Sequence, residues 1–362
     1  MDSTTASSAT RGAFTLSVDG VDCPVMVEAG ETLLKAGLRQ GLRIPHLCLV
    51  GDCGSCRCRL VSGQVQLKKD ISNHIHLGDI ASGHLLACQA LAGSDVQLEV
   101  PGLSPMASDA LAFRNLKGRI VSTDPMNHDI REVVVELEAP MQYRAGQYAQ
   151  VTVPGHDGLA DEPRCYSFSE APVAGGSTRV TFHVRRVPGG LLTEWLFASD
   201  RTGHALDVSG PLGDFAHDGS ATRPMVCVAG GSGLAPIKAL IEELATQAQV
   251  PDLTLFFGAR TQADLYCLEE IETLQTRWRG RFIFVPVLSL EPVSSGWSGL
   301  TGYCGEHLDK FCDLPSSSFY FCGPPPMVDA LVHRLEGQAD ARHIHYDRFL
   351  DRSTLNLQET TA

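Results

Sequence analysis

Four of the twelve cysteines form a series that constrains the fold more than any other feature of the sequence. Three of them share one short loop and the fourth lies farther along the chain: Cys48, Cys53, Cys56 and Cys88. Four thiolates placed in this way can hold a metal centre, so the fold must bring a later segment back to the loop. Gly51 and Gly54 lie within the loop, and the lack of a Cβ permits the unusual backbone angles that a tight ligand loop requires.

The spacing of the series indicates which metal centre it can hold. Cys-x4-Cys-x2-Cys with a distant fourth cysteine is the plant-type pattern that binds a [2Fe–2S] cluster. A structural zinc site usually needs two Cys-x2-Cys pairs, and only Cys53 and Cys56 form one in this sequence. Unrelated buried cysteines are the remaining alternative. We therefore expect Cys48, Cys53, Cys56 and Cys88 to bind the cluster, with Cys58 as a strand residue and not a fifth ligand.

Composition and charge exclude several classes of partner. The net charge is −13 at pH 7 and no dense block of Lys and Arg occurs, so we expect no nucleic-acid partner. No run approaches about 18 consecutive apolar residues, so we expect no direct membrane insertion. Residues 1–11 lack the apolar core of a signal peptide, which predicts a cytoplasmic chain whose cysteines stay reduced.

A chain of 362 residues is longer than one hydrophobic core usually organises, so several domains are expected. Residues 13–101 have the pattern of a small β-grasp-like α+β domain that carries the cysteine series. Apolar periodicity predicts its elements: strands 14–18, 25–28 and 96–100 and a helix at 31–40. We expect residues 1–12 to form a disordered tail and residues 102–112, which contain turn formers, to form a linker.

Two further domains follow with different element patterns. Residues 113–217 contain many short strands with turn signals between them, which is typical of an antiparallel β-barrel. The predicted strands are 119–122, 131–137, 147–153, 165–169, 178–186 and 205–209. Residues 220–350 alternate apolar strands with helices, which predicts a doubly wound parallel α/β domain. Its predicted elements are strands 225–229, 253–257, 282–288 and 319–321 and helices 237–244 and 328–335, before a tail at 351–362.

A group of side chains suited to a flavin lies at the start of a predicted barrel strand. Arg164 can pair with a pyrophosphate, Tyr166 can cover a flat ring, and the Ser167 hydroxyl can bond a ring nitrogen. Arg-x-Tyr-Ser is a short motif, and an ordinary barrel strand is the alternative interpretation. Downstream, Pro188 to Thr193 opens a helix with glycines and a hydroxyl, which is typical of a phosphate site. A diphosphate cofactor fits both segments.

A glycine-rich turn marks the candidate nucleotide site of the α/β domain. Gly230 to Pro236 lies between the first strand and its helix, where dinucleotide pyrophosphates bind in such folds. Pro236 stands where the last glycine of G-x-G-x-x-G would be, so a tight strand-to-helix turn is the alternative. After the second strand, an arginine could favour a 2′-phosphate and an acid the free ribose hydroxyl. Arg260 and Asp264 supply both, so these residues leave NADH and NADPH undecided.

A thiol lies at the end of a later strand of the same domain. Cys322 to Met327, with the sequence Cys-Gly-Pro-Pro-Pro-Met, follows a short apolar strand. This order places the thiol at the carboxyl edge of the sheet, where ligands bind in doubly wound folds. A buried, inert cysteine is the alternative interpretation.

With these signatures in order, the chain resembles the oxygenase reductases of the ferredoxin-NADP⁺ reductase superfamily that carry an N-terminal plant-type ferredoxin domain. Within that family the likeness is to the electron-transfer components of xylene-type monooxygenases. It rests on long matching strings: Val180 to Arg185, Val187 to Gly190, Val226 to Gly231, Gly233 to Lys238, Phe256 to Arg260, Asp264 to Leu268 and Cys322 to Asp329. Long strings are far more specific than any single motif.

The resemblance implies a role for the residues of these motifs. Arg164 would bind the flavin pyrophosphate, Tyr166 would stack on the isoalloxazine ring, and Ser167 would contact its N5 region. Ser167 and Cys322 are the candidate catalytic residues, with Cys322 near the point of hydride transfer. The other implied cofactor-binding residues are His183, Val184, Gly190, Leu191, Thr193, Gly231, Ser232, Gly233, Arg260, Asp264, Gly323, Pro324 and Met327. Phe349 is a candidate flavin cover, although some family members end in such an aromatic residue and this chain continues to residue 362.

The resemblance also implies a function. NADH gives two electrons as a hydride and a [2Fe–2S] cluster accepts one at a time, so FAD is expected between them. NADH is expected because the relatives use it. The expected acceptor is the hydroxylase of an aromatic or alkyl-aromatic hydrocarbon, of the xylene, toluene or cymene type. The alternative is the reductase of a soluble Rieske ring dioxygenase, and the residues do not separate the two.

The expected partner is therefore a terminal oxygenase. We expect a monomer in the cytoplasm, or at the inner face of the membrane through a membrane-bound partner. A redox sensor or electron carrier with scaffold domains is a rival of another class, and the intact flavin and nucleotide motifs argue against it. The oxygenase is expected to dock around the cysteine loop, at His46, Asp52, Arg57 and Arg59.

Overall fold

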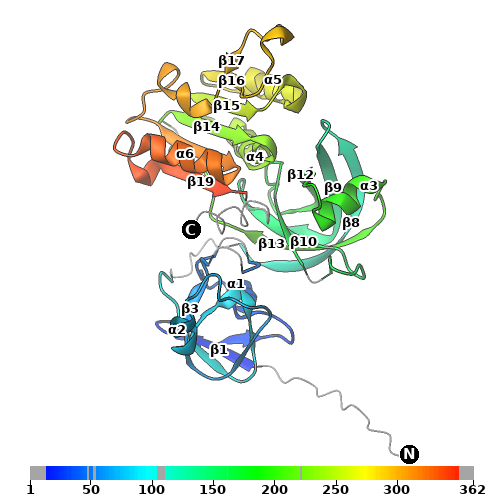
Figure 1. Ribbon diagram of the computed structural model, residues 1–362, viewed down its shortest axis with the longest axis vertical. Helices are drawn as coiled ribbons and strands as arrows, with labels where there is room; N and C mark the ends of the chain where they lie inside the picture. The colour runs from blue at the N-terminus through cyan, green and yellow to red at the C-terminus, as the bar shows by residue number, and fades with distance from the viewer. Residues whose placement is uncertain are drawn as a thin grey trace, which may run out of the picture. The chain divides into compact units, whose positions relative to one another are not determined.

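The computed structural model describes residues 14–46, 49–51, 54–103, 111–160, 162–220 and 222–349 (Figure 1). It divides into two compact units, Met1–Phe113 and Arg114–Ala362. The expected tails at 1–12 and 351–362, and residues 104–110 of the expected linker, lie outside the described residues. Among the described residues, no helix is long and apolar enough to cross a membrane.

The first unit is built on a mixed five-stranded sheet with the order β2-β1-β7-β3-β5. β1 runs parallel to β7 and antiparallel to β2, while β3 runs antiparallel to both β7 and β5. Its elements are β1 (Phe14–Val18), β2 (Val25–Val27), α1 (Leu33–Arg39), β3 (Arg57–Ser62), β4 (Val65–Leu67), α2 (Leu77–Ala81), β5 (His84–Leu86), β6 (Ala90–Ala92) and β7 (Val96–Glu99). The expected β-grasp α+β domain is confirmed.

Local sequence explains how the helix of this domain begins and packs. Thr32 is the N-cap of α1, and its hydroxyl accepts a hydrogen bond from the Lys35 amide at 3.4 Å. Leu33 and Leu34 of the first turn are fully buried, as is Leu16 of β1. Burial of these side chains on one face of the sheet fixes α1 against it.

The second unit begins with an antiparallel six-stranded sheet in the order β11-β10-β13-β8-β9-β12. An isolated bridge between Phe168 and Phe182 joins the two edge strands and closes the barrel. The alternating residues Val133, Val135 and Leu137 of β9 are buried in its core. The strands are β8 (Arg114–Pro125), β9 (Ile130–Met141), β10 (Tyr148–Thr152), β11 (Arg164–Ser167), β12 (Ser177–Arg185) and β13 (Ala205–Leu212).

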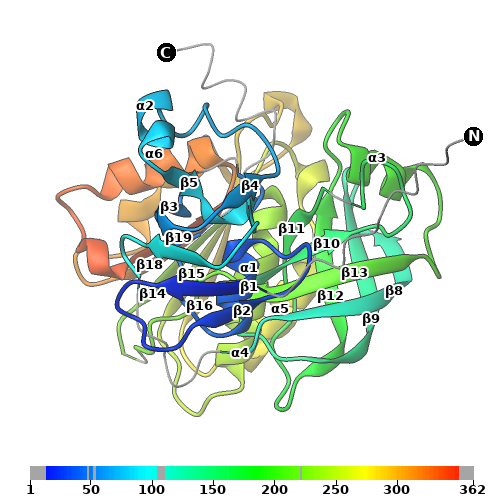
Figure 2. The ribbon, with the colours of Figure 1, turned by 90° about the horizontal axis from the view of Figure 1, so that it is seen from below.

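One helix accompanies the barrel. α3 (Leu191–Ala198) follows β12 and lies beside the barrel strands in both views (Figures 1 and 2). Its buried side chains Leu192 and Leu196 belong to the barrel core. Residues 186–190 join the end of β12 to the first turn of α3, and this junction carries the Pro188 to Thr193 motif.

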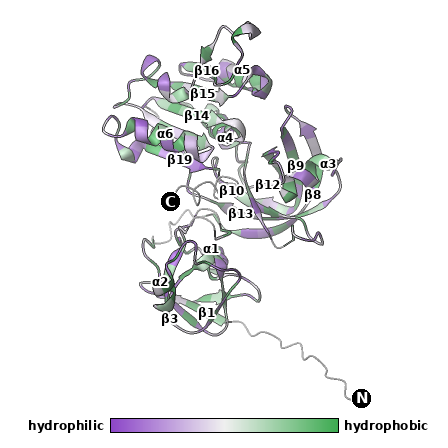
Figure 3. Ribbon diagram, in the orientation of Figure 1, coloured by the Kyte–Doolittle hydropathy of each residue, from purple (hydrophilic) through white to green (hydrophobic). Residues whose placement is uncertain are grey.

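The rest of the second unit is a parallel six-stranded sheet in the order β17-β16-β15-β14-β18-β19. Buried residues of β14 alternate between two faces: Cys227 and Ala229 pack with α4 and α5, and Val226 and Val228 pack with α6. Figure 3 shows hydrophobic residues concentrated along these strands. The elements are β14 (Met225–Gly230), α4 (Leu234–Ala245), β15 (Leu253–Ala259), α5 (Leu268–Arg277), β16 (Phe282–Leu288), β17 (Leu300–Thr301), β18 (Ser318–Gly323), α6 (Pro325–Leu335) and β19 (Ile344–Arg348).

The strand order creates one switch point in this sheet. β14 pairs with β15 on one side and with β18 on the other. The strand order therefore reverses direction between β14 and β18. Ligands of doubly wound folds bind in the crevice outside the carboxyl ends of the strands at such a point. The expected doubly wound α/β domain is confirmed. The segments that follow β14 and β18 are therefore the candidate ligand site of this sheet.

Candidate cofactor and electron-transfer sites

The β-grasp sheet brings two of the four expected cluster ligands together. Cys56 precedes β3 and Cys88 follows β5, and these two strands pair with Arg57 opposite Leu86. The Ala87 amide donates to the Cys56 carbonyl at 3.0 Å, and each of the two cysteines is 3% exposed. Cys48 and Cys53 lie outside the described residues.

The described part of the cysteine loop has the backbone that a cluster site needs. Gly51 and Gly54 have positive φ angles of 83° and 73°, and Leu49 is also left-handed at 54°. A Cβ on Gly51 would lie 2.6 Å from the Gln89 side chain, so this glycine allows the loop to approach the segment after Cys88. Two neighbouring buried thiols under a left-handed loop fit a [2Fe–2S] cluster.

Gln89 is a candidate cluster-site residue that no motif marks. Its side-chain Nε2 donates to Cys88 Sγ at 3.4 Å, and the residue is 6% exposed. Hydrogen bonds to ligand sulfurs tune metal centres, so Gln89 belongs to the chemistry of the site. Cys58 behaves as expected for a strand residue: its thiol donates to the Leu85 carbonyl at 3.8 Å, and burial raises its pKa to about 12.

Strand β11 places Tyr166 and Ser167, two of the three expected flavin residues, on opposite faces. Ser167 lies opposite Tyr148 of β10, and Tyr166 lies opposite Ala149, whose side chain belongs to the barrel core. Tyr166 therefore points inward and Ser167 outward, because successive strand residues alternate. Ser167 is 6% exposed. β11 is an edge strand of the sheet. A flavin ring that contacted both Tyr166 and Ser167 would therefore lie across the free edge of this strand.

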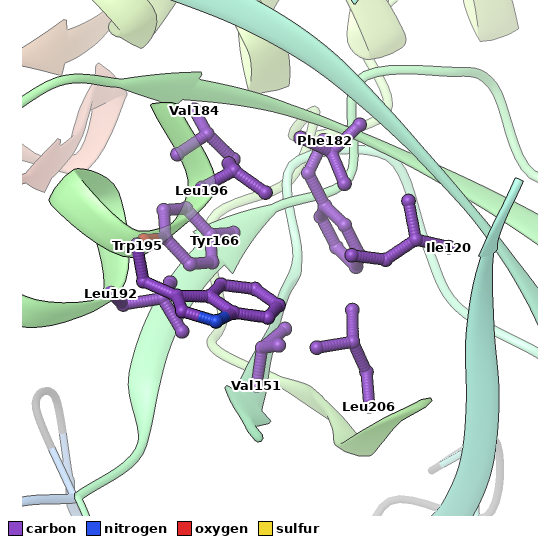
Figure 4. Close-up of a pocket in the computed structure, with 10 residues that line it drawn as sticks. Ile120, Val151, Tyr166, Phe182, Val184, Leu192, Trp195, Leu196 and Leu206 are labelled. Carbon is purple, nitrogen blue, oxygen red and sulfur yellow. The ribbon is translucent and has the colours of Figure 1, made fainter. Parts of the chain in front are cut away.

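Tyr166 lines a small cavity inside the barrel (Figure 4). Its ring lies among Val184, Leu196 and Trp195, and the cavity has a volume of about 20 Å³. A volume near that of one water, with apolar walls, is far too small for a flavin. Val184 lines the same cavity and belongs to the barrel core. In this structure it therefore packs inside the barrel.

Arg164 is held by its own neighbours. Its guanidinium pairs with Glu162 at 3.0 Å and donates to the carbonyls of Glu162 and Pro163 at 3.0 and 3.2 Å. The Arg164 side chain is 28% exposed. A pyrophosphate at this position would compete with the Glu162 carboxylate for the guanidinium, which can bind either group bidentately.

The junction before α3 offers backbone amides to an anion. Gly190 is the N-cap, and among the described side chains none caps this helix end by a hydrogen bond. The Thr193 hydroxyl instead bonds Val187 and Gly190 within the turn, at 3.1 to 3.2 Å. Leu191 is 51% exposed, so the first turn is accessible. Uncapped amides at a helix N-terminus fit the pyrophosphate of FAD.

The switch point of the α/β sheet is shaped by glycines that admit no side chain. A Cβ on Gly233 would lie 2.1 Å from the Cys322 carbonyl oxygen, and one on Gly230 would lie 2.6 Å from Met327 Sδ. Gly323, with φ at 151°, would place a Cβ 2.9 Å from Met327 Cε. The loop after β14, with Ser232 at its centre, and the loop after β18 therefore touch. This cradle fits the nicotinamide nucleotide.

The thiol of Cys322 is fully buried at this cradle. Its exposed fraction is 0%, and burial raises its pKa well above the ordinary value, so the group is a neutral thiol. Pro324 is the N-cap of α6 and contacts Gly230. The Phe349 amide donates to the Gly323 carbonyl at 2.9 Å, which places the candidate flavin cover at the same sheet edge.

Asp347 is a titratable group that the motifs did not indicate. It lies opposite Cys322 in the pairing of β18 with β19, and burial raises the pKa of its carboxyl to about 7. Its backbone amide also donates to the Cys322 thiol. Perturbed carboxyl groups gather at functional sites, so Asp347 joins the candidate residues. The unpredicted strand β19 explains why it was missed.

Arg260 and Asp264 form an ion pair at the end of β15. Their closest atoms are 2.8 Å apart, and Asp129 of the barrel hairpin pairs with both Arg260, at 3.3 Å, and Arg185, at 2.9 Å. Burial would raise the pKa of Asp264, but hydrogen bonds from Arg260 and Thr261 outweigh it and lower the pKa. Two carboxylates thus neutralise the arginine that would otherwise attract a 2′-phosphate, which favours NADH.

His183 connects the barrel to the nucleotide loop. The Tyr266 hydroxyl oxygen lies 3.4 Å from His183 Nδ1, and the same hydroxyl donates to the Gly231 carbonyl at 3.1 Å. Burial lowers the pKa of His183 to about 3, with Lys238 adding to the effect, so the imidazole is neutral. The structure therefore brings His183, Gly231 and Cys322 into one region, while Arg164 and Thr193 lie at the barrel motifs.

Comparison with known proteins agrees with this arrangement. Three family models match in order: the 2Fe-2S iron-sulfur cluster binding domain at residues 16–93, the oxidoreductase FAD-binding domain at 117–217 and the oxidoreductase NAD-binding domain at 227–333. Each model covers the segment in which the corresponding site residues lie. The chain therefore uses FAD, a [2Fe–2S] cluster and NADH.

Relatives match over nearly the full length. The xylene/toluene monooxygenase electron transfer component of Pseudomonas putida is 40% identical over 93% of this chain and 94% of that protein. The reductase component of phenol 2-monooxygenase from Pseudomonas sp. (strain CF600) is 30% identical over 93% of this chain and 94% of its own length. The solved structure of the ferredoxin reductase in carbazole 1,9a-dioxygenase superposes with a TM-score of 0.81, at 26% identity, covering 94% of this chain and 99% of that one. The chain belongs to the family of flavin and [2Fe–2S] reductases that oxidise NADH and supply electrons to the oxygenase components of multicomponent oxygenases.

Proposed function

We propose that the oxygenase served by this chain is the hydroxylase of an aromatic or alkyl-aromatic hydrocarbon. The observation that carries the proposal is the 40% identity to a xylene/toluene monooxygenase component over 93% of this chain. The reductase in carbazole 1,9a-dioxygenase has the same fold at 26% identity. A soluble ring dioxygenase is therefore the second candidate, and the reductase component of the naphthalene 1,2-dioxygenase system of Pseudomonas putida is 32% identical over 89% of this chain.

The cofactor-binding roles of individual residues are part of this proposal. When bound, FAD accepts a hydride and passes electrons on singly. Arg164 and the α3 amides would hold its pyrophosphate, Tyr166 would bound the ring on the barrel side, and Ser167 would hydrogen-bond the N5 edge. The glycine cradle would orient NADH, because its backbone approaches so closely that a side chain would block the nucleotide. Proximity and orientation, not acid–base chemistry, would supply the catalysis.

The domain limits, oligomeric state and location are proposals as well. We assign residues 13–101 to the cluster domain, 113–217 to the flavin barrel and 220–350 to the nucleotide domain, since the three family matches fall inside these limits. We propose a monomer in the cytoplasm that reaches the inner face of the membrane when its partner is membrane-bound.

The oxygenase would dock near the cysteine loop. Arg57 pairs with Asp79 at 2.9 Å and Arg59 pairs with Glu99, and the two arginine side chains are 41% and 45% exposed. His46 Nδ1 donates to the Ile44 carbonyl at 2.7 Å, and Asp52 lies outside the described residues. Exposed charged pairs beside a cluster suit a transient electron-transfer contact.

Reconstitution tests the proposal directly. Purified reductase loaded with FAD and cluster would be combined with candidate hydroxylases, one membrane-bound and one soluble, and with a ring dioxygenase. We expect NADH-dependent product with an alkyl-aromatic hydroxylase at a rate at least about tenfold above the dioxygenase. Equal or faster turnover with the dioxygenase would overturn the assignment in favour of the second candidate.

A further inference from the structure

Lys238 is a buried lysine that the motifs leave unexplained. It lies in α4, the helix that begins directly after the Gly231 to Gly233 turn, and it is 8% exposed. Burial would lower the pKa of its ammonium group, but Glu242, one turn along the helix, outweighs burial and raises the pKa. The group is therefore a buried cation paired with a carboxylate.

Both members of this pair form hydrogen bonds with the turn that follows strand β11, residues 169–171. Lys238 Nζ donates to the Ser169 carbonyl at 3.2 Å, and the Ala171 amide donates to Glu242 Oε2 at 3.0 Å. Ser169 stands two residues after Ser167, the candidate flavin contact. α4 follows the nucleotide turn directly, and two hydrogen bonds join this helix to the segment after the flavin strand.

The turn at residues 169–171 also forms contacts with the barrel. The Tyr143 ring stacks on Phe168 with centroids 3.9 Å apart, and its hydroxyl donates to the carbonyls of Glu170 and Ala171 at 3.2 and 3.4 Å. The Ser169 amide donates to the Thr181 carbonyl at 3.0 Å. These contacts hold the turn to the barrel, so movement of α4 would move the nucleotide turn relative to the flavin strand.

Stability alone gives a weak reason for this arrangement. A buried ion pair is often no more stabilising than apolar side chains of the same volume. Directional contacts, by contrast, fix geometry in a way that apolar packing does not.

We propose that Lys238 and Glu242 are positioning residues that set the separation between the nucleotide turn and the flavin strand, and so the geometry of hydride transfer. The inference rests on the proposed roles of Ser167 and of Gly231 to Gly233. Hydride transfer depends steeply on the distance between donor and acceptor atoms, because misplacement by about 1 Å can cost about a hundredfold in rate.

The test compares Lys238→Met, Lys238→Arg and Glu242→Gln with the native protein under anaerobic single turnover with NADH. Rates are taken per bound flavin, with the apparent Kd for NADH, the long-wavelength charge-transfer absorbance and the isotope effect of deuterated NADH. The control is Lys117→Met, which removes an exposed lysine paired with Asp207 on the barrel at 3.6 Å.

We expect Lys238→Met to lower the limiting rate of flavin reduction about tenfold, with the Kd for NADH within about twofold and a weaker charge-transfer absorbance. Lys238→Arg should recover most of the rate, Glu242→Gln should show a smaller loss, and the control should show none. An unchanged rate per bound flavin in both Lys238→Met and Glu242→Gln would overturn the inference, as would a loss explained entirely by lower FAD content. If Lys238→Met does not fold, Glu242→Gln decides the outcome. Failure of the native protein to reduce flavin with NADH would instead contradict the proposed function.

Discussion

Single side chains outside the motifs complete the sites that the motifs begin. Gln89 donates to Cys88, a candidate cluster ligand, and Asp347 lies opposite Cys322 in the strand pairing. Sequence marks ligands because metal chemistry restricts residue type and spacing. It does not mark a glutamine or an aspartate whose importance comes from folding beside the ligand. Such residues are found only when the strands are paired.

Replacement of Gln89 by leucine should lower the reduction potential of the cluster. The amide stabilises the additional negative charge of the reduced state, and a net hydrogen bond of about 1 kcal/mol corresponds to roughly 40 mV for one electron. A potentiometric titration followed by electron paramagnetic resonance measures the shift. The matched control is Gln97→Leu, whose amide donates to Asp19 instead. Equal potentials in all three proteins would show that the Gln89 bond does not act on the cluster.

Replacement of Ser167 by alanine should slow flavin reduction by NADH about tenfold without loss of FAD. The hydroxyl would be lost from the N5 edge while the backbone pairing with Tyr148 is retained. Stopped-flow absorbance under anaerobic conditions gives the rate, and Ser122→Ala on β8 serves as control. A Ser167→Ala protein that reduces its flavin at the native rate would remove Ser167 from the candidate catalytic residues.

Asp347 should make the stability of the folded chain depend on pH. Its folded-state pKa of about 7 lies above the usual value of 3.8, so the folded chain keeps a proton that the unfolded chain releases. The free energy of unfolding therefore falls as pH rises from about 4 to about 7 and levels off above that range. In Asp347→Asn this decrease should be smaller, seen as a smaller loss of Tm between about pH 5 and pH 8. An unaltered pH profile, matching that of the exposed-site control Asp313→Asn, would contradict the assignment.

At the scale of elements, the candidate nucleotide site is a contact between the segments at the ends of two strands. Gly233 follows β14, Cys322 is the second-last residue of β18, and a Cβ on Gly233 would lie 2.1 Å from the Cys322 carbonyl oxygen. Backbone atoms cannot yield as a flexible side chain can. Any residue larger than glycine must therefore push the loop away from the sheet edge.

The variant Gly233→Ala should lose NADH-dependent flavin reduction by about a hundredfold, because the displaced turn no longer aligns the nucleotide. FAD and cluster content should stay native, since both sites lie on other elements. Stopped-flow reduction and cofactor analysis provide the measurements. Gly305→Ala is the control, because its Cβ would meet nothing closer than 3.5 Å. Native reduction rates in Gly233→Ala would show that the cradle is not the nucleotide site.

Elements with a clear apolar period were predictable, and short or polar ones were not. β16 was predicted at its observed bounds of Phe282–Leu288, and β8 and β9 were predicted but are longer than expected. β19 was missed because Ile344–Arg348 contains His345, Asp347 and Arg348, which do not form an apolar strand pattern. Its partner β18 supplies the pairing, and that partner is not visible locally.

At the scale of the whole molecule, the order of motifs predicted three domains and one electron path. The contacts that join the barrel to the α/β sheet were beyond prediction. Asp129 meets Arg260 across 131 positions of sequence, and Lys238 meets Ser169 across 69. Neither pair has a local pattern, since each forms only after both domains have folded. The function was therefore predictable from the ligands, and the geometry of hydride transfer was not.

The central claim is that one chain carries electrons from NADH through FAD to the [2Fe–2S] cluster. An anaerobic addition of NADH to protein fully loaded with both cofactors, followed by optical absorbance and low-temperature electron paramagnetic resonance, tests it most directly. The account predicts that the flavin absorbance bleaches and that a cluster signal of about one spin per chain appears. In Cys88→Ser the bleaching should persist and the cluster signal should be lost. Flavin bleaching with no cluster signal in the fully loaded native protein would contradict the account.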